Sequence, residues 1–207
     1  MGFFDFLKPS RRVQGRIGFF GLEEWWSSAF SDDERRQIQT TFRPLGFTGD
    51  SLTSGSIIST DQTAVGFLQA LAGWFTKEQD RPIAYKMLDK AEELARTGVP
   101  VLDVHFLYDQ EIGIYYRDRD KQAFLDKAIL ACRKQIALAP KTARAFKSEY
   151  RNEPLPTHRG YEQLAIILEK RGDYREVIDL CAQAQAQGWS GTWARRIERC
   201  KKGLTKT

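Results

Sequence analysis

Hydrophobic residues recur at helical spacing in the last third of the chain. One stripe consists of Tyr161, Leu164, Ala165 and Leu168, and a second, after Gly172 and Asp173, consists of Tyr174, Val177, Ile178, Cys181 and Ala184. Each set lies on one face of a 3.6-residue helix. Glycine tolerates the positive φ of a turn, and Asp accepts hydrogen bonds from the first amides of the next helix. The pattern therefore predicts a helical hairpin over residues 159–189, closed by Gly188.

Two more hairpins are predicted upstream, over residues 63–96 and 101–139. The first has a leading helix with two apolar stripes, Val65, Leu68, Ala72 and Phe75 beside Phe67, Leu71 and Trp74. The second has the stripes Val104, Tyr108, Ile112 and Tyr115 and then Phe124, Ala128, Ala131 and Cys132 around an Asp118-Arg119-Asp120 turn. Proline fits the first turn of a helix but disrupts its interior, so Pro82 is expected to begin a helix and Pro140 to end one.

The segments around these hairpins carry weaker patterns. Residues 19–43 predict one bent or two short helices, with a capping box at Ser31-Asp32-Asp33-Glu34. Residues 45–60 are rich in Gly, Ser and Thr and are expected to form a linker, of a kind that is often mobile or used in binding. Residues 141–157 are expected to be an insertion with a short helix of its own. Trp193, Ile197, Cys200 and Leu204 predict a basic terminal helix.

Residues 159–189 resemble a tetratricopeptide repeat (TPR). The resemblance is carried by Tyr161, the Leu164-Ala165 pair, the Gly172-Asp173-Tyr174 turn and Ala184. Val177 and Cys181 depart from the usual residues, and Gly188-Trp189 replaces the usual final proline. The unit covers roughly 30 residues, close to the period of about 34 that such repeats have.

The expected fold is therefore all-α. It consists of a short right-handed α-solenoid of about three helical hairpins, with an N-terminal helical extension and a C-terminal capping helix. Residues 1–60 would form the extension, packed on the solenoid, and residues 61–207 the repeat domain. The last helix would cover the hydrophobic face that a terminal repeat otherwise leaves in water.

Composition and charge limit the function classes. The chain has 207 residues, is 42% hydrophobic and 12% aromatic, and is globular rather than disordered in composition. No apolar run approaches the roughly 20 residues that span a bilayer, and no secretory signal is recognisable. The three cysteines have no C-x-x-C spacing, which indicates reduced core residues, no metal site and a cytoplasmic protein.

Catalytic chemistry finds no support in the sequence. The two histidines, His105 and His158, lie in separate hairpins without metal-ligand spacing. His105 is expected to be a packing residue and His158 to help start a helix. A Gly-rich phosphate loop, a nucleophile elbow and an H-E-x-x-H motif are all missing. We therefore expect a protein that is not an enzyme and that needs no cofactor.

The TPR resemblance implies a protein or peptide partner bound on a concave surface lined by the first helices of the hairpins. In this sequence the exposed positions of those helices, and hence the predicted partner-binding residues, are Tyr108, Asp109, Arg117, Arg159, Glu162, Ile166, Glu169 and Lys170. Mixed charge around an apolar residue suits a peptide held by side-chain pairs and one buried anchor.

Two alternatives to this function remain open. The net charge of +5 is concentrated at the ends, with +3 in residues 1–16 and +5 in residues 195–207, so that the intervening residues carry −3. Basic ends could hold nucleic acid or an acidic membrane, the latter with help from the Phe-rich segment 1–8. That segment and the adjacent Trp25 and Trp26 could instead pack on the protein's own core or on a second copy, as in a homo-oligomer.

Overall fold

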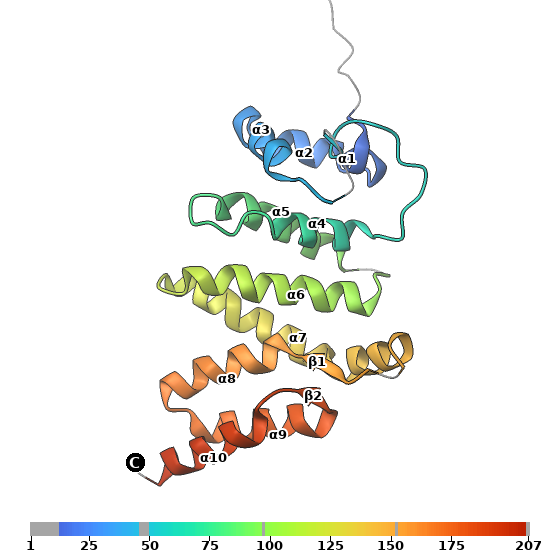
Figure 1. Ribbon diagram of the computed structural model, residues 1–207. Helices are drawn as coiled ribbons and strands as arrows, with labels where there is room; N and C mark the ends of the chain where they lie inside the picture. The colour runs from blue at the N-terminus through green and yellow to red at the C-terminus, as the bar shows by residue number, and fades with distance from the viewer. Residues whose placement is uncertain (1–12, 46–49, 97, 152, 206–207) are drawn as a thin grey trace, which may run out of the picture. The chain divides into compact units, whose positions relative to one another are not determined.

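The computed structural model describes residues 13–45, 50–96, 98–151 and 153–205, and these are mostly helical, as predicted (Figure 1). The chain divides into two compact units, residues 1–64 and 65–207. The amphipathic segment 1–8 lies outside the described residues. The elements are α1 (Gly15–Phe19), α2 (Glu23–Ala29), α3 (Asp32–Thr41), α4 (Ala64–Ala72), α5 (Arg81–Leu94), α6 (Val101–Tyr115), η1 (Tyr116–Asp118), α7 (Gln122–Glu149), β1 (Leu155–Thr157), α8 (Arg159–Arg171), α9 (Tyr174–Gln187), β2 (Trp189–Ser190) and α10 (Trp193–Leu204).

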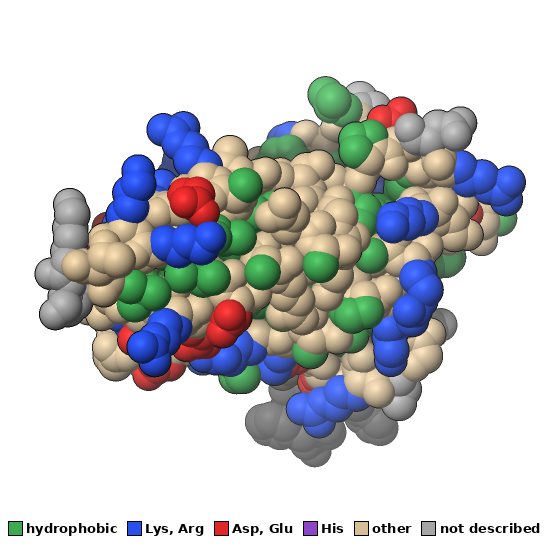
Figure 2. Space-filling view, turned by 90° about the horizontal axis from the view of Figure 1, so that it is seen from below, with side chains coloured by type: hydrophobic (Ala, Val, Ile, Leu, Met, Phe, Trp, Pro, Cys, Tyr) green, Lys and Arg blue, Asp and Glu red, His purple; other side chains and the backbone are tan. Residues whose placement is uncertain are grey.

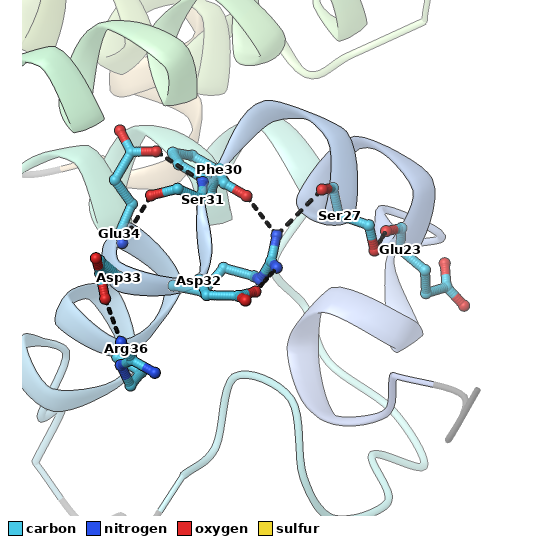
Figure 3. Close-up of polar contacts among 9 residues, drawn as sticks. Glu23, Ser27, Phe30, Ser31, Asp32, Asp33, Glu34 and Arg36 are labelled. Atoms are coloured by element: carbon cyan, nitrogen blue, oxygen red, sulfur yellow. Dashed lines mark hydrogen bonds and ion pairs between the residues drawn. The ribbon is translucent and has the colours of Figure 1, made fainter. Parts of the chain in front are cut away.

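In the first unit, the predicted capping box is present at the start of α3 (Figure 3). Ser31 Oγ accepts a hydrogen bond from the Glu34 amide at 3.2 Å, and the Ser31 amide donates to the Glu34 carboxylate at 2.8 Å. Asp32 and Asp33 each pair with an arginine one turn later on the same helix. The two hydrogen bonds between Ser31 and Glu34 satisfy free amides at the helix start, which is why a polar S-D-D-E sequence begins a helix here.

The stretch predicted as a linker packs back onto the start of α1. The amides of residues 14–17 donate to carbonyls between Ser51 and Gly55 at 2.9–3.2 Å. Gly15 has a φ of +60°, and a Cβ there would lie 2.6 Å from the Leu52 carbonyl oxygen, so this approach requires glycine. Trp26 is buried, with its ring 5.4 Å from that of Phe30, and thus contributes to the core of this unit.

In the second unit, consecutive helices pack as neighbours from α5 through to α10, and α6 also contacts α8. The predicted third hairpin is confirmed as α8 and α9. Gly172 and Gly188 end these helices with φ values of 83° and 85°, the left-handed geometry expected of C-terminal glycines. The terminal helix is confirmed as α10, which buries Trp193 and Cys200.

The prediction that Pro140 ends the second hairpin is wrong. Pro140 lies inside α7, which continues to Glu149, so residues 141–149 extend that helix and do not form a separate one. Pro140 is exposed, while Ala139, Ala143 and Phe146 continue the buried face. The side-chain hydroxyl of Thr142 donates to carbonyls of the preceding turn at 3.2 and 3.3 Å. Packing of the apolar face thus outweighs the missing proline N–H.

Two features of the second unit have no counterpart in the predicted pattern. Strands β1 and β2 pair in parallel, with Leu155 opposite Trp189. The guanidinium of Arg81 binds the Asp118 carboxylate through two hydrogen bonds of 2.7 Å, and both residues are buried. The Arg81 hydrogen bonds hold the pKa of Asp118 below its usual range. The polar turn after α6 is therefore a buried anchor to α5.

Candidate functional site

A polar pocket of about 450 Å³ lies where α6 and α8 meet in the second unit. It is lined by Asp109 from α6, Thr157 from β1, and Arg159, Glu162, Gln163 and Ile166 from α8. The four α8 residues follow the spacing i, i+3, i+4 and i+7, which places them on one face of the helix. α6 and α8 are the first helices of consecutive hairpins, so this pocket is the main candidate for a binding site.

The structure gathers four of the eight predicted partner-binding residues at this pocket, namely Asp109, Arg159, Glu162 and Ile166. It places the other four elsewhere. Tyr108 lies against α7, with the Lys134 ammonium 5.6 Å from its ring centre, and Arg117 is exposed on η1. Glu169 and Lys170 belong to the last turn of α8, where Lys170 is exposed.

Sequence reasoning missed Gln163 and Thr157. Gln163 could have been found, because it stands four residues after Arg159 on the same predicted helical face. No sequence pattern pointed to Thr157, because it lies in β1 and its place at the pocket depends on the pairing of β1 with β2.

The position of α8 relative to α6 is set by one buried amide side chain. Gln135 of α7 is fully buried; its Nε2 donates to the His105 carbonyl at 3.0 Å, and its Oε1 accepts from the Gly160 amide at 2.7 Å. A Cβ at Gly160 would lie 2.8 Å from Gln135 Oε1 and 3.0 Å from the Cys132 carbonyl, so the close approach of α7 and α8 needs glycine. One side chain thereby ties together α6, α7 and α8.

His158 starts α8 as predicted. Its Nδ1 accepts a hydrogen bond from the Tyr161 amide at 3.3 Å, which satisfies one of the free amides at the helix start. The ring is fully buried beside His105 and Trp189, at centroid distances of 5.2 and 4.7 Å. Burial, with a smaller contribution from His105, lowers the pKa of His158 to about 3, and burial lowers that of His105 to about 4. Both rings are therefore neutral at pH 7 and pack in the core.

An ion pair crosses from α8 to α6 at the edge of the pocket. Arg159 Nε lies 3.0 Å from Asp109 Oδ2, and the two side chains are 49% and 29% exposed. Gly113 makes room for this contact, because a Cβ there would lie 2.9 Å from Arg159 Nη1. Arg159 is the only cation among the described residues that line the pocket, and it is already paired with a carboxylate of the pocket itself.

Three other pocket groups retain binding capacity. Glu162 is exposed, and none of the described residues forms an ion pair or hydrogen bond with its carboxylate. Gln163 Nε2 is buried and finds no hydrogen-bond acceptor among the described residues. Ile166 is half-buried and supplies the apolar surface of the pocket.

The other end of α8 is held by the terminal helix. Glu169 accepts hydrogen bonds from Arg196 at 2.8 Å and from Nε and Nη2 on one edge of the Arg199 guanidinium. The Arg199 hydrogen bond is the main reason that the pKa of Glu169 lies below its usual value. Glu169 was predicted to line the groove, but the structure assigns its carboxylate to the contact between α8 and α10.

Other kinds of site find little support. Within the described ranges there is no group of three or more His, Cys, Asp and Glu side chains that could hold a metal ion, and no helix long and apolar enough to cross a membrane. Cys132, Cys181 and Cys200 are free and buried, and burial raises the pKa of each thiol. Among the described residues, a smaller pocket of about 270 Å³ in the first unit is lined largely by glycines and apolar side chains, and Glu23 is the one charged residue.

The basic charge of α10 is partly used inside the protein. Arg196 and Arg199 bind Glu169, and Lys201 pairs with Glu198 at 2.9 Å. Figure 2 shows Lys and Arg side chains toward both ends of this face, with Asp and Glu side chains among them at one end and hydrophobic and neutral surface in the middle. The middle of this face therefore holds no cluster of described Lys and Arg side chains of the kind that nucleic acids and acidic lipids require.

Comparisons of the chain with protein-family models, with curated proteins and with solved structures each found no match. The resemblance of residues 159–189 to a TPR therefore stays a prediction from their sequence, and the function has to be argued from the residues of the chain itself.

Proposed function

We propose that this protein is a non-catalytic interaction module that binds a peptide, or an extended segment of a partner protein, in the groove between α6 and α8. In this proposal the hairpins α4–α5, α6–α7 and α8–α9 form a short, right-handed TPR-like solenoid capped by α10. The free, buried cysteines are in keeping with a cytoplasmic protein.

One observation carries the proposal. The pocket of about 450 Å³ lies between the first helices of two consecutive hairpins, and four residues predicted to bind a partner line it. Its lining combines polar groups with one half-buried isoleucine, which suits a ligand anchored by an apolar contact and oriented by hydrogen bonds.

The proposal can be tested by selecting binders from a phage-displayed library of random peptides with the purified protein. The affinities of selected peptides are then measured for the wild type, for Ile166→Arg and for Gln185→Arg. Gln185 is exposed on α9 and does not line the pocket, so its variant adds the same charge elsewhere.

We expect Ile166→Arg to weaken selected peptides about tenfold or more, because a buried anchor surface is replaced by a charge. Gln185→Arg should leave the affinities unchanged. If no peptide is enriched, or if both variants bind alike, the groove does not bind peptides and the proposal is wrong.

A further inference from the structure

The fixed charges of the pocket determine which side chains it can accept. Two carboxylates, Asp109 and Glu162, and one guanidinium, that of Arg159, line it. Arg159 is paired with Asp109 at 3.0 Å, whereas the Glu162 carboxylate has no partner among the described residues. The pocket thus has a net charge of −1, and its unpaired charge is an anion. A cationic group is the complement to this arrangement, and an acidic group would be repelled.

A second requirement comes from Gln163. Its Nε2 is buried, donates to no acceptor in the described part of the chain, and belongs to a residue that lines the pocket. A buried amide donor that lacks an acceptor raises the free energy of the folded protein. Because this nitrogen is buried, the Gln163 side chain has to turn toward the pocket before a ligand carbonyl oxygen can reach it. The hydrogen bond formed in this way would remove that unfavourable contribution. The backbone carbonyl of an extended peptide supplies such an oxygen at every residue.

The spacing of these groups on α8 supports a single ligand segment. Glu162 and Gln163 are adjacent, and Ile166 follows one turn after Gln163 on the same helical face. An anionic, a hydrogen-bonding and an apolar group are thereby presented side by side. The stem of a Lys or Arg side chain is apolar and can cover an isoleucine while its charged head reaches a carboxylate.

We infer that the pocket recognises a Lys or Arg residue in an extended peptide, with the cationic head paired with Glu162 and a peptide carbonyl accepting a hydrogen bond from Gln163 Nε2. This inference rests on the proposed function and names the chemistry of its partner. In this inference Glu162 selects a cationic side chain over a neutral one, and the hydrogen bond from Gln163 strengthens the binding of either.

The test uses two small probes, Nα-acetyl-arginine N-methylamide and its citrulline counterpart. Citrulline has nearly the shape of arginine but no charge, and both probes carry peptide carbonyls. Binding is followed by the side-chain amide signals of Gln163 in ¹⁵N-labelled protein, identified by their loss in Gln163→Met, and by the backbone amide signals of the other pocket residues, which remain measurable in that variant. The measurement is repeated with Glu162→Gln and with Asp179→Asn, in which an exposed carboxylate of α9 is removed instead.

We expect the arginine probe to bind the wild type and Asp179→Asn about fivefold more tightly than the citrulline probe, and the two probes to bind Glu162→Gln alike. Gln163→Met keeps the side-chain length but has no donor. It should weaken both probes by a similar factor, about threefold to tenfold, without lowering the stability of the unliganded protein.

The outcomes separate this inference from the proposed function. If library peptides bind and depend on Ile166 but the citrulline probe binds as well as the arginine probe, or selected peptides are rich in Asp and Glu, the groove binds peptides and the preference for cations is wrong. If neither probe shifts the Gln163 signals and no library peptide is enriched, both proposals fail.

Discussion

Glu162 and Glu169 lie about two turns apart on α8, and the comparison between them separates the two ends of this helix. Glu169 is four-fifths buried and accepts hydrogen bonds from Arg196 and Arg199 of α10. Glu162 is exposed at the pocket and lacks a partner among the described residues. The same residue type therefore holds a neighbouring helix at one end of α8 and is available to a ligand at the other.

The difference arises from what lies opposite each glutamate. Glu169 faces α10, which contributes the guanidinium groups of Arg196 and Arg199. At the Glu162 end the neighbouring helix α6 contributes a carboxylate, Asp109, whose partner Arg159 comes from α8 itself. A carboxylate that is buried with partners contributes to stability, whereas one left unpaired beside a pocket stays accessible to a cationic ligand.

The largest loss of stability is expected when the buried hydrogen bonds of Gln135, which hold the N-terminal end of α8, are broken. Gln135→Leu should lower the free energy of unfolding by about 3 kcal/mol, because the Gly160 amide and the His105 carbonyl both lose their partner inside the core. Urea denaturation measures this loss. Gln183→Leu, an exposed change on α9, serves as the control and should change stability by less than about 0.5 kcal/mol.

The two ends of α8 should also respond to acid in different pH ranges. The folded pKa of His158, about 3, lies below its unfolded value of about 6.5, so its contribution to stability is complete above pH 6.5 and is lost as the pH falls toward 3. The folded pKa of Glu169 is also lowered, so its contribution is complete above the ordinary pKa of a glutamate and is lost as the pH falls from that pKa toward the lowered one.

Replacement of His158 by Asn keeps a side chain that can cap the helix but removes the titration. Between pH 6.5 and pH 4 the wild type should therefore lose about 2 kcal/mol more than His158→Asn. Urea denaturation across this range gives the difference. Equal slopes for the two proteins would mean that His158 titrates in the folded state as it does in the unfolded chain.

Removing the charge of each glutamate in turn compares the two ends directly. Glu169→Gln should cost about 1 to 2 kcal/mol of stability, because Arg196 is only 13% exposed and would lose its carboxylate partner. Glu162→Gln should change stability by less than about 0.5 kcal/mol. Thermal or urea unfolding of both variants tests this, and similar losses would remove the distinction between them.

The smallest changes in stability and in ligand affinity are expected for a substitution on the α6 side of the pocket, at Gly113. Gly113→Ala replaces glycine inside a helix, which favours folding by up to about 1 kcal/mol. The new methyl group would displace the Arg159 guanidinium, which lies 2.9 Å from the Cβ position. We expect unchanged or slightly higher stability, and about threefold weaker binding of an arginine peptide, because a displaced Arg159 would repel the ligand. Unaltered affinity would show that the Arg159 position does not matter.

The sequence was sufficient to predict the elements that depend on interactions between residues close together in the chain. The capping box at Ser31, the glycine turn at Gly172 and the apolar face of α8 each depend on residues within a few positions of one another. The face that contains Arg159, Glu162 and Ile166 followed from the TPR resemblance together with helical periodicity, and the same periodicity would have placed Gln163 on it.

Features that depend on distant contacts escaped prediction. Glu169 was assigned to the groove because its partners, Arg196 and Arg199, come 27 and 30 residues later in the chain. Pro140 was expected to end a helix, since its local preference says nothing of the buried face that carries α7 onward. The bridging role of Gln135 likewise requires two neighbouring helices that the sequence pattern does not place.

The most direct test of the account is a chemical-shift map of ¹⁵N-labelled protein with the most strongly selected library peptide. We predict the largest changes at Glu162, Gln163 and Gly113, with the signals of Glu169 and Arg196 nearly unchanged. Changes concentrated on α9 and α10, with the α6–α8 pocket unaffected, would contradict the assignment of recognition to the N-terminal half of α8.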